Sequence, residues 1–164
     1  MSDGFTTFAG ALIQRGWQVV RCGQSLAFPR DEALRYPWLP DDVRKFLTSF
    51  EVVVSPSQAA WLITGAELAG KTDSSFAWNQ WELDSLAAAN GDDEWQTSIR
   101  AFWDDHFPVL LSVKSGYAYV AVRKDLTIIM GEEPEFEETD HLADTFSSFL
   151  EMLMQGDTRL DRLI

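Results

Sequence analysis

Three apolar runs separated by short turn segments constrain the fold of this chain more than any other feature of its sequence. The runs cover residues 109–113, 117–122 and 126–130, and the first turn between them contains Ser115-Gly116. Strands that are joined by turns of only a few residues pair in antiparallel fashion. The sequence therefore predicts an antiparallel meander over about residues 109–130.

Helical spacing of apolar residues on both sides of the meander predicts the helices that pack against it. Residues three and four positions apart share one face of a helix, and this spacing indicates five amphipathic helices. They cover about residues 5–13, 41–50, 81–89, 93–103 and 142–153. Asp3 and either Asp92 or Asp93 have side chains that can cap a helix start, and Gly156 is suited to end the last helix.

Further short strands and one irregular segment complete the expected fold. Apolar runs at 17–21, 52–54 and 60–64 predict strands, and the three prolines between residues 23 and 40 predict a loop. No internal repeat or long linker divides the chain. We therefore expect one α+β domain over residues 1–164, in which a central antiparallel sheet is packed by N-terminal, middle and C-terminal helices.

The tryptophans divide into two groups by their position in these elements. Those in periodic segments are predicted to lie in the core, and they are Trp61, Trp95 and Trp103. Those in or near loops either pack the loops onto the core or form exposed anchors for a protein partner, and they are Trp38, Trp78 and Trp81.

The charge balance excludes several classes of partner. The chain has 164 residues with 13 basic and 26 acidic side chains, a formal charge of −13, and its 46% apolar content is enough for a hydrophobic core. Such a balance argues against nucleic acid and against an anionic membrane as direct partners, since both require a basic surface. The sequence lacks an apolar run long enough to span a bilayer and a basic, apolar leader at its start. With Cys22 as the only cysteine, we expect a soluble cytoplasmic protein.

The acidic residues are concentrated in the second half of the chain. Residues 131–164 contain ten acidic and two basic residues, and six of the nine residues from 132 to 140 are acids. Such clusters either make the surface soluble or form a docking face for a basic partner. The candidate partner-binding residues are Asp92, Asp93, Glu94, Asp104, Asp105, Glu132, Glu133, Glu135 and Glu137.

The segment Gly65–Thr72 matches the spacing of a phosphate-binding loop, G-x4-G-K-T. Such a loop requires a preceding strand and a helix that begins at the lysine, here Lys71. The interior of this segment favours a helical turn and contains Glu67, whose carboxylate would repel phosphate. A chance match is the favoured interpretation, and a small nucleotide-binding enzyme is the alternative.

Other catalytic and metal-binding patterns are weak. His106 follows Asp104-Asp105, and His141 lies close to Asp144, but neither histidine belongs to a spaced metal-binding pair. A metal-binding enzyme that uses His106 is therefore a second alternative. Cys22 is more typical of an inert thiol than of a nucleophile. We expect no catalysis, no cofactor and no resident metal.

The order of these features resembles the SUKH superfamily, the Smi/Knr-like group that includes many bacterial immunity proteins. Residues 39–47, Leu-Pro-Asp-Asp-Val-Arg-Lys-Phe-Leu, are similar to the helix opening of that family. Residues 107–111 and 116–120 resemble its central hairpin, and residues 143–150 resemble its closing helix. The resemblance covers about residues 39–154.

This resemblance implies an α+β fold without catalytic activity that binds another protein. For bacterial members it implies that the partner is a cognate toxin, often a nuclease, which is neutralised inside the producing cell. We expect a monomer or weak homodimer that binds a basic toxin. A regulatory scaffold, as in the fungal members, is the remaining alternative.

Overall fold

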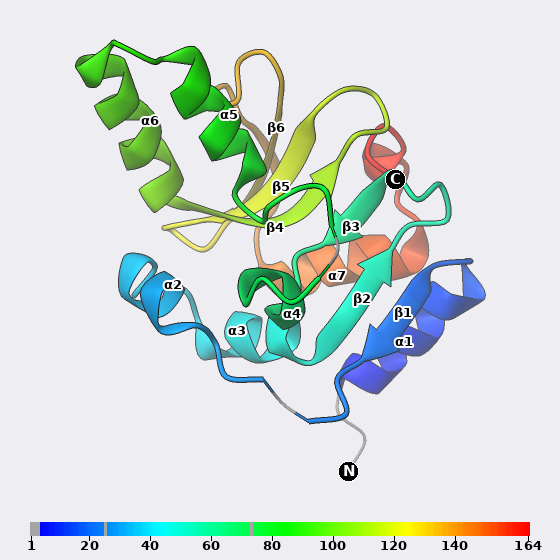
Figure 1. The fold of residues 1–164 in the computed structure, drawn as a ribbon. Coiled ribbons are helices and arrows are strands. Elements are labelled where there is room, and N and C mark those ends of the chain that lie inside the picture. The colour runs from blue at the N-terminus through cyan, green and yellow to red at the C-terminus, as the bar shows by residue number, and fades with distance from the viewer. Residues whose placement is uncertain (1–3, 25, 73) are drawn as a thin grey trace.

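The computed structural model describes residues 4–24, 26–72 and 74–164, and in these ranges a single antiparallel sheet organises the chain (Figure 1). Its strand order follows the chain order from β1 to β7, so each strand pairs with the strands before and after it. The strands are β1 (Gln18–Arg21), β2 (Phe50–Val54), β3 (Ala60–Leu62), β4 (His106–Ser112), β5 (Ala118–Arg123), β6 (Ile128–Glu132) and β7 (Asp140–Ala143).

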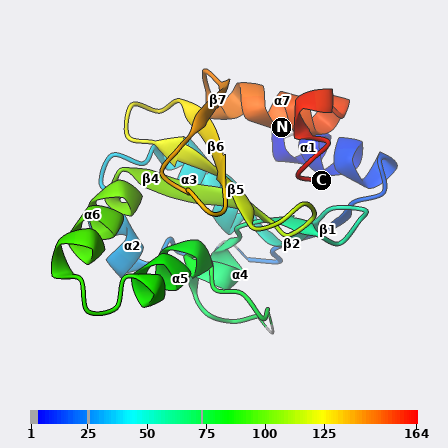
Figure 2. The ribbon, with the colours of Figure 1, turned by 90° about the horizontal axis from the view of Figure 1, so that it is seen from above.

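Helices cover both faces of this sheet (Figure 2). They are α1 (Gly4–Gln14), α2 (Arg30–Arg35), α3 (Asp41–Thr48), α4 (Gly65–Leu68), α5 (Gln80–Ala88), α6 (Asp93–Asp104) and α7 (Phe146–Gln155), with a 3-10 turn at Thr158–Leu160. Figure 2 shows α1 and α7 together on one face and α5 and α6 on the other. On the first face the ring of Phe46 in α3 lies 5.0 Å from Phe8 and 5.3 Å from Phe146, so one aromatic cluster joins three helices.

The predicted α+β class and the predicted meander are both confirmed. Strands β4, β5 and β6 occupy the three apolar runs, and β5 pairs with β6 from Ala118–Glu132 to Val122–Ile128. The predicted runs near residues 17–21, 52–54 and 60–64 form β1, β2 and β3. All seven residues of β4 are buried, because helices or strands cover it on every side.

The segment from residue 23 to residue 40 is not the irregular loop that its prolines predict, because it contains α2. Pro29 occupies the N-cap position of that helix with φ −60° and ψ 140°, and Pro37 lies beyond its last residue. Proline fits before or at the start of a helix and after its end, where no backbone N–H donor is required. The prolines therefore bracket a helix instead of preventing one.

Two apolar residues that were assigned to helical stripes lie in strands. Helix α3 ends at Thr48, and Phe50 begins β2. Leu142 belongs to β7, a strand that was not predicted, and α7 begins four residues later. Both side chains are buried, so the pattern located the core correctly and assigned the wrong backbone. The Asp3 cap lies outside the described residues.

One tryptophan differs from the prediction, and a second matches one of the two alternatives that the sequence left open. Trp95 is 50% exposed, because α6 packs through its second half, where Ile99 and Trp103 are buried. Trp81 is buried, and its indole N–H donates a hydrogen bond of 2.9 Å to the carbonyl of Ala118 in β5. In the described ranges, no helix is long and apolar enough to cross a membrane.

Candidate protein-binding surface

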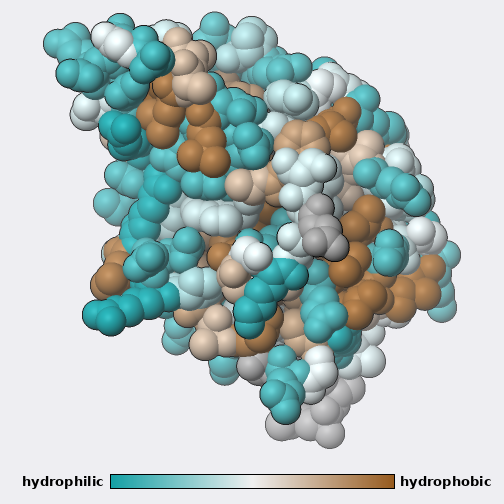
Figure 3. Space-filling model, viewed as in Figure 1, coloured by the Kyte–Doolittle hydropathy of each residue, from teal (hydrophilic) through white to brown (hydrophobic). Residues whose placement is uncertain are grey.

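The structure divides the predicted acidic residues among three positions. Asp92, Asp93 and Glu94 lie at the start of α6, and Asp104 and Asp105 lie at its end, about 18 Å away along a helix of 12 residues. The third group starts at the last residue of β6, Glu132, and continues in the loop to β7 with Glu133, Glu135 and Glu137. Hydrophilic side chains cover most of α6 in the face shown in Figure 3.

Phe136 anchors the acidic β6–β7 loop to the core. Its side chain is buried, while Glu135 and Glu137 on either side are exposed. Its ring stacks on Trp81 with the centroids 6.0 Å apart and an angle of 7° between the planes. The hydroxyl of Tyr119 donates a hydrogen bond of 2.5 Å to the carbonyl of Phe136. The loop therefore presents its carboxylates from a fixed backbone.

Sequence reasoning missed this anchor, although a signal was present. Phe136 is the one apolar side chain in the run from Glu132 to Asp140, other than the ring of Pro134. An aromatic residue in so acidic a run costs free energy when it is exposed and gains free energy when it is buried. A lone aromatic of this kind indicates a loop that is attached to the core.

Gly131 provides the space that the anchor requires. A Cβ atom at this position would lie only 2.7 Å from the hydroxyl oxygen of Tyr119. We expect Gly131→Ala to lower the free energy of unfolding by about 1–3 kcal/mol, because the tyrosine must move away from Phe136. Denaturant unfolding measures this change.

Gly10→Ala is the matched control for that substitution. A Cβ atom at Gly10 meets nothing within 4 Å, and the residue lies inside α1. Alanine is a better helix former than glycine, so the same chemical change should raise stability there by up to about 1 kcal/mol. Equal effects of the two substitutions would show that the contact between Gly131 and Tyr119 is unimportant.

Three of the nine predicted acids have structural roles within the chain. The carboxylate of Asp104 lies 2.8 Å from Nε of Arg35, and that of Glu132 lies 3.0 Å from Nη2 of Arg162. The Asp92 side chain accepts a hydrogen bond from the backbone N–H of Trp95 and caps α6. The other six are exposed and form no ion pair within the described ranges, and they are Asp93, Glu94, Asp105, Glu133, Glu135 and Glu137.

The Gly65–Thr72 segment lacks the geometry of a phosphate-binding loop. Residues 65–68 form α4, which Thr64 caps by accepting a hydrogen bond from the N–H of Glu67. No helix begins at Lys71 in the described ranges, since the next helix starts at Gln80. The helical turn replaces the extended loop whose N–H groups would surround phosphates.

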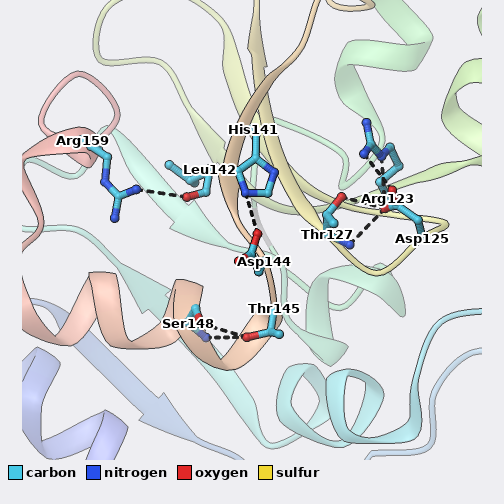
Figure 4. Close-up of polar contacts among 9 residues, drawn as sticks. All are labelled: Arg123, Asp125, Thr127, His141, Leu142, Asp144, Thr145, Ser148 and Arg159. Carbon is cyan, nitrogen blue, oxygen red and sulfur yellow. Dashed lines mark hydrogen bonds and ion pairs between the residues drawn. The ribbon is translucent and has the colours of Figure 1, made fainter.

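The two histidines serve local contacts. The Nδ1 atom of His106 lies 2.6 Å from the carbonyl of Phe102, and its ring stacks on the Phe102 ring at 3.9 Å. Burial lowers the pKa of His106 and keeps the ring neutral. The Nε2 atom of His141 lies 3.0 Å from a carboxylate oxygen of Asp144, a contact that Figure 4 shows.

Two further observations bear on metal and thiol chemistry. Over residues 4–24, 26–72 and 74–164, no group of three or more His, Cys, Asp or Glu side chains is arranged to hold a metal ion. Burial and the nearby Glu51 carboxylate raise the pKa of Cys22, so its thiol stays protonated and weakly nucleophilic.

Comparisons with known proteins identify no relative whose function could be considered for this chain. No family model, curated protein or solved structure matches it. The SUKH-like order of motifs over residues 39–154 is therefore a resemblance without an independent match. The six exposed carboxylates, and the anchored loop that holds three of them, are the features from which a function is inferred.

Proposed function

We propose that this chain is a non-catalytic protein that binds a basic protein partner through the β6–β7 loop and the start of α6. The partner would be a cognate toxin, which the chain neutralises in the cytoplasm. The observation that carries the proposal is the loop itself, in which Glu133, Glu135 and Glu137 surround the buried Phe136, are exposed and form no ion pair with a described residue.

A carboxylate that forms no ion pair within the chain can attract a basic ligand without first losing an existing contact. Complementary charge speeds the encounter of two proteins and excludes wrong partners. A loop that is already fixed by Phe136 loses little conformational entropy on binding, so more of the interaction energy contributes to affinity. Both properties suit an inhibitor that must capture a basic protein quickly.

The alternatives are less well supported. A nucleotide-binding enzyme requires a phosphate-binding loop where α4 lies. A metal-binding enzyme that uses His106 would need further ligands beside it. Among the described residues, no group of three or more His, Cys, Asp or Glu side chains is arranged to hold a metal ion, and Asp104 is paired with Arg35. A regulatory scaffold would use the same surface and would differ from the proposal in the identity of its partner.

Co-expression with the product of the adjacent gene tests the proposal directly. We expect the two proteins to purify as a complex and the chain to suppress the toxicity of its partner. Absence of both a complex and protection would overturn the immunity function.

Neutralising the loop should slow this association. We expect the triple variant Glu133→Gln/Glu135→Gln/Glu137→Gln to lower the association rate by about tenfold at low salt, because electrostatic steering contributes factors of that order. Stopped-flow or surface-based kinetics at two ionic strengths measures it. The rates of wild type and variant should converge at high salt.

A control with the same change in net charge separates the loop from the chain's overall charge. Glu51→Gln/Asp84→Asn/Glu151→Gln neutralises three exposed acids that lie on other elements. The rate should change little in this variant. An equal decrease in both triple variants would assign the effect to total charge and remove the loop from the interface.

A further inference from the structure

The turn between β5 and β6 places a leucine where a glycine is normally required. The N–H of Leu126 donates to the carbonyl of Arg123 at 2.7 Å, and the N–H of Arg123 donates to the carbonyl of Thr127 at 2.9 Å. This is a three-residue hairpin loop, whose last residue adopts the left-handed conformation that favours glycine or asparagine. Leu126 has φ 73°. A branched side chain is disfavoured in this conformation.

The side chains of the turn hold Leu126 in this conformation. Asp125 forms an ion pair of 2.7 Å with Nη2 of Arg123, and it accepts hydrogen bonds from the N–H and the hydroxyl of Thr127 at 3.1 and 2.7 Å (Figure 4). The Leu126 side chain is nevertheless 42% exposed. Burial in the core therefore gives only part of the free energy that would offset a strained backbone.

The leucine borders a shallow apolar cavity at this end of the sheet. The cavity has a volume of about 430 Å³ and lies between the start of α3, the β5–β6 turn and the corner where β7 leads into α7. Its apolar lining includes Val43, Val122, Leu126 and Phe146, and its acidic lining residues are Asp42 and Asp144. We call this cavity the Leu126 trough.

The formal charge of the trough lining is negative. Both acids are exposed, and among the described residues the Asp144 carboxylate contacts His141. Helices α3 and α7 both begin here, and each helix start contributes about half a positive charge, which two full carboxylates outweigh. The helix starts already have acceptors, since Asp42 accepts from the N–H of Val43 and Thr145 from that of Ser148.

The cations of the turn lie outside the trough lining. Arg123 is paired with Asp125. Lys124 is exposed, and its backbone N–H donates to the carbonyl of Asp105 at 2.9 Å. This contact places Asp105, one of the predicted partner-binding acids, beside the turn. The trough and Asp105 therefore lie at the same end of the central strands.

We propose that the Leu126 trough receives an arginine side chain of the basic protein partner. The aliphatic stem would pack on Leu126 and Phe146, and the guanidinium would lie between Asp42 and Asp144. Arginine combines an apolar stem with a planar cation that binds carboxylates, and it is enriched at the centres of protein interfaces. The inference rests on the proposed function, and it adds a second contact region at the opposite end of β6 from the acidic β6–β7 loop.

A small probe tests the trough without the partner. Nα-acetyl-arginine amide is titrated into the labelled full chain, and methyl and amide resonances are followed by NMR. We expect saturable shifts at Val43, Val122 and Leu126 and none at Leu34, an exposed leucine on α2. Nα-acetyl-citrulline amide, which has nearly the same shape without the charge, should produce no saturable shift.

Leu126→Gly should separate binding from folding. Glycine adopts a φ of 73° without steric cost, so we expect the denaturation midpoint to rise. The affinity for the arginine probe should fall by about tenfold, because the apolar contact with the arginine stem is lost. Leu34→Ala is the matched control and should leave binding unchanged. Asp42→Asn/Asp144→Asn should abolish the preference for arginine over citrulline.

The outcomes distinguish this inference from the proposed function. No saturable shift in the wild type, or equal affinity in Leu126→Gly, overturns the trough even if the adjacent gene product is bound. Saturable binding of the probe without a complex with that product supports the trough and overturns the immunity function.

Discussion

Arg35→Ala should lower the free energy of unfolding by about 3–5 kcal/mol. Arg35 lies in α2 and donates hydrogen bonds of 2.8 and 2.7 Å to the two carboxylate oxygens of Glu82 in α5, and a third of 2.8 Å to Asp104 in α6. The Glu82 residue is only 5% exposed. Loss of the guanidinium therefore leaves a buried carboxylate without a partner. Chemical denaturation measures the loss, and the melting temperature should fall by about 10 °C.

Two controls define the cause of this effect. Arg162→Ala removes an exposed ion pair with Glu132 and should cost at most about 1 kcal/mol. The double variant Arg35→Met/Glu82→Leu removes both buried charges and should recover most of the stability. A loss below about 1 kcal/mol in Arg35→Ala would show that Glu82 is adequately hydrated.

The second large effect concerns Glu67 and depends on pH. Burial raises the pKa of Glu67 from its ordinary 4.5 to about 8, and its Oε2 atom is buried without a hydrogen-bond partner. The folded chain therefore holds a proton that the unfolded chain releases near pH 4.5. The resulting stability is fully present below pH 4.5, is lost as the pH rises to about 8, and changes no further above it.

Glu67→Gln should remove this dependence because the amide stays neutral. We expect the variant to match the wild type at low pH and to exceed it by about 2–4 kcal/mol above pH 8. Denaturant unfolding across the pH range, expressed as the difference between the two proteins, isolates the effect from the other acids. Glu151→Gln, at an exposed position of α7, is the control, and its free energy of unfolding should change with pH in parallel with that of the wild type. The same parallel behaviour in Glu67→Gln would contradict the prediction.

The fold could be predicted wherever neighbouring strands are also neighbours in the sequence. The meander was readable because β4, β5 and β6 follow one another through short turns. The pairing of β3 with β4 could not be predicted, since Trp61 pairs with Leu111 across three intervening helices, α4, α5 and α6. Tertiary packing decides such non-local pairs, and no local pattern encodes them.

Individual elements were assigned wrongly where a buried apolar residue lies at helical spacing by chance, because apolar spacing alone does not distinguish a helix from a strand. Phe50 and Leu142 are buried at helical spacing from true helix residues, yet both lie in strands. Strand β7 was hidden because Asp140 and His141 are exposed at an edge, which leaves only Leu142 and Ala143 as an apolar signal. Trp95 shows the converse error, in which the backbone is predicted correctly and the burial is not. It lies in α6 as predicted, but in the first half of that helix, and only the second half packs on the core.

The candidate surface was predictable in composition and not in geometry. The acidic clusters were visible as residues, but the separation of the two ends of α6 and the pairing of Asp104 with Arg35 required the structure. The role of Phe136 and the strained conformation of Leu126 also appeared only there. Contacts between distant segments determine each of these features.

The open sheet has one further consequence, which concerns self-association. Its edges are β1 and β7, each four residues long, and the register of β1 shifts between Val20 and Arg21. Short, irregular or charged edges are poor templates for a strand from a second molecule. At the β7 edge, an added strand would meet the exposed Asp140 and His141 and the neighbouring Asp144, and two copies would approach against a net charge of −13 on each chain. The Asp144 carboxylate, which would contact the arginine of a basic partner, thus also discourages fibre-like stacking of the chain with itself.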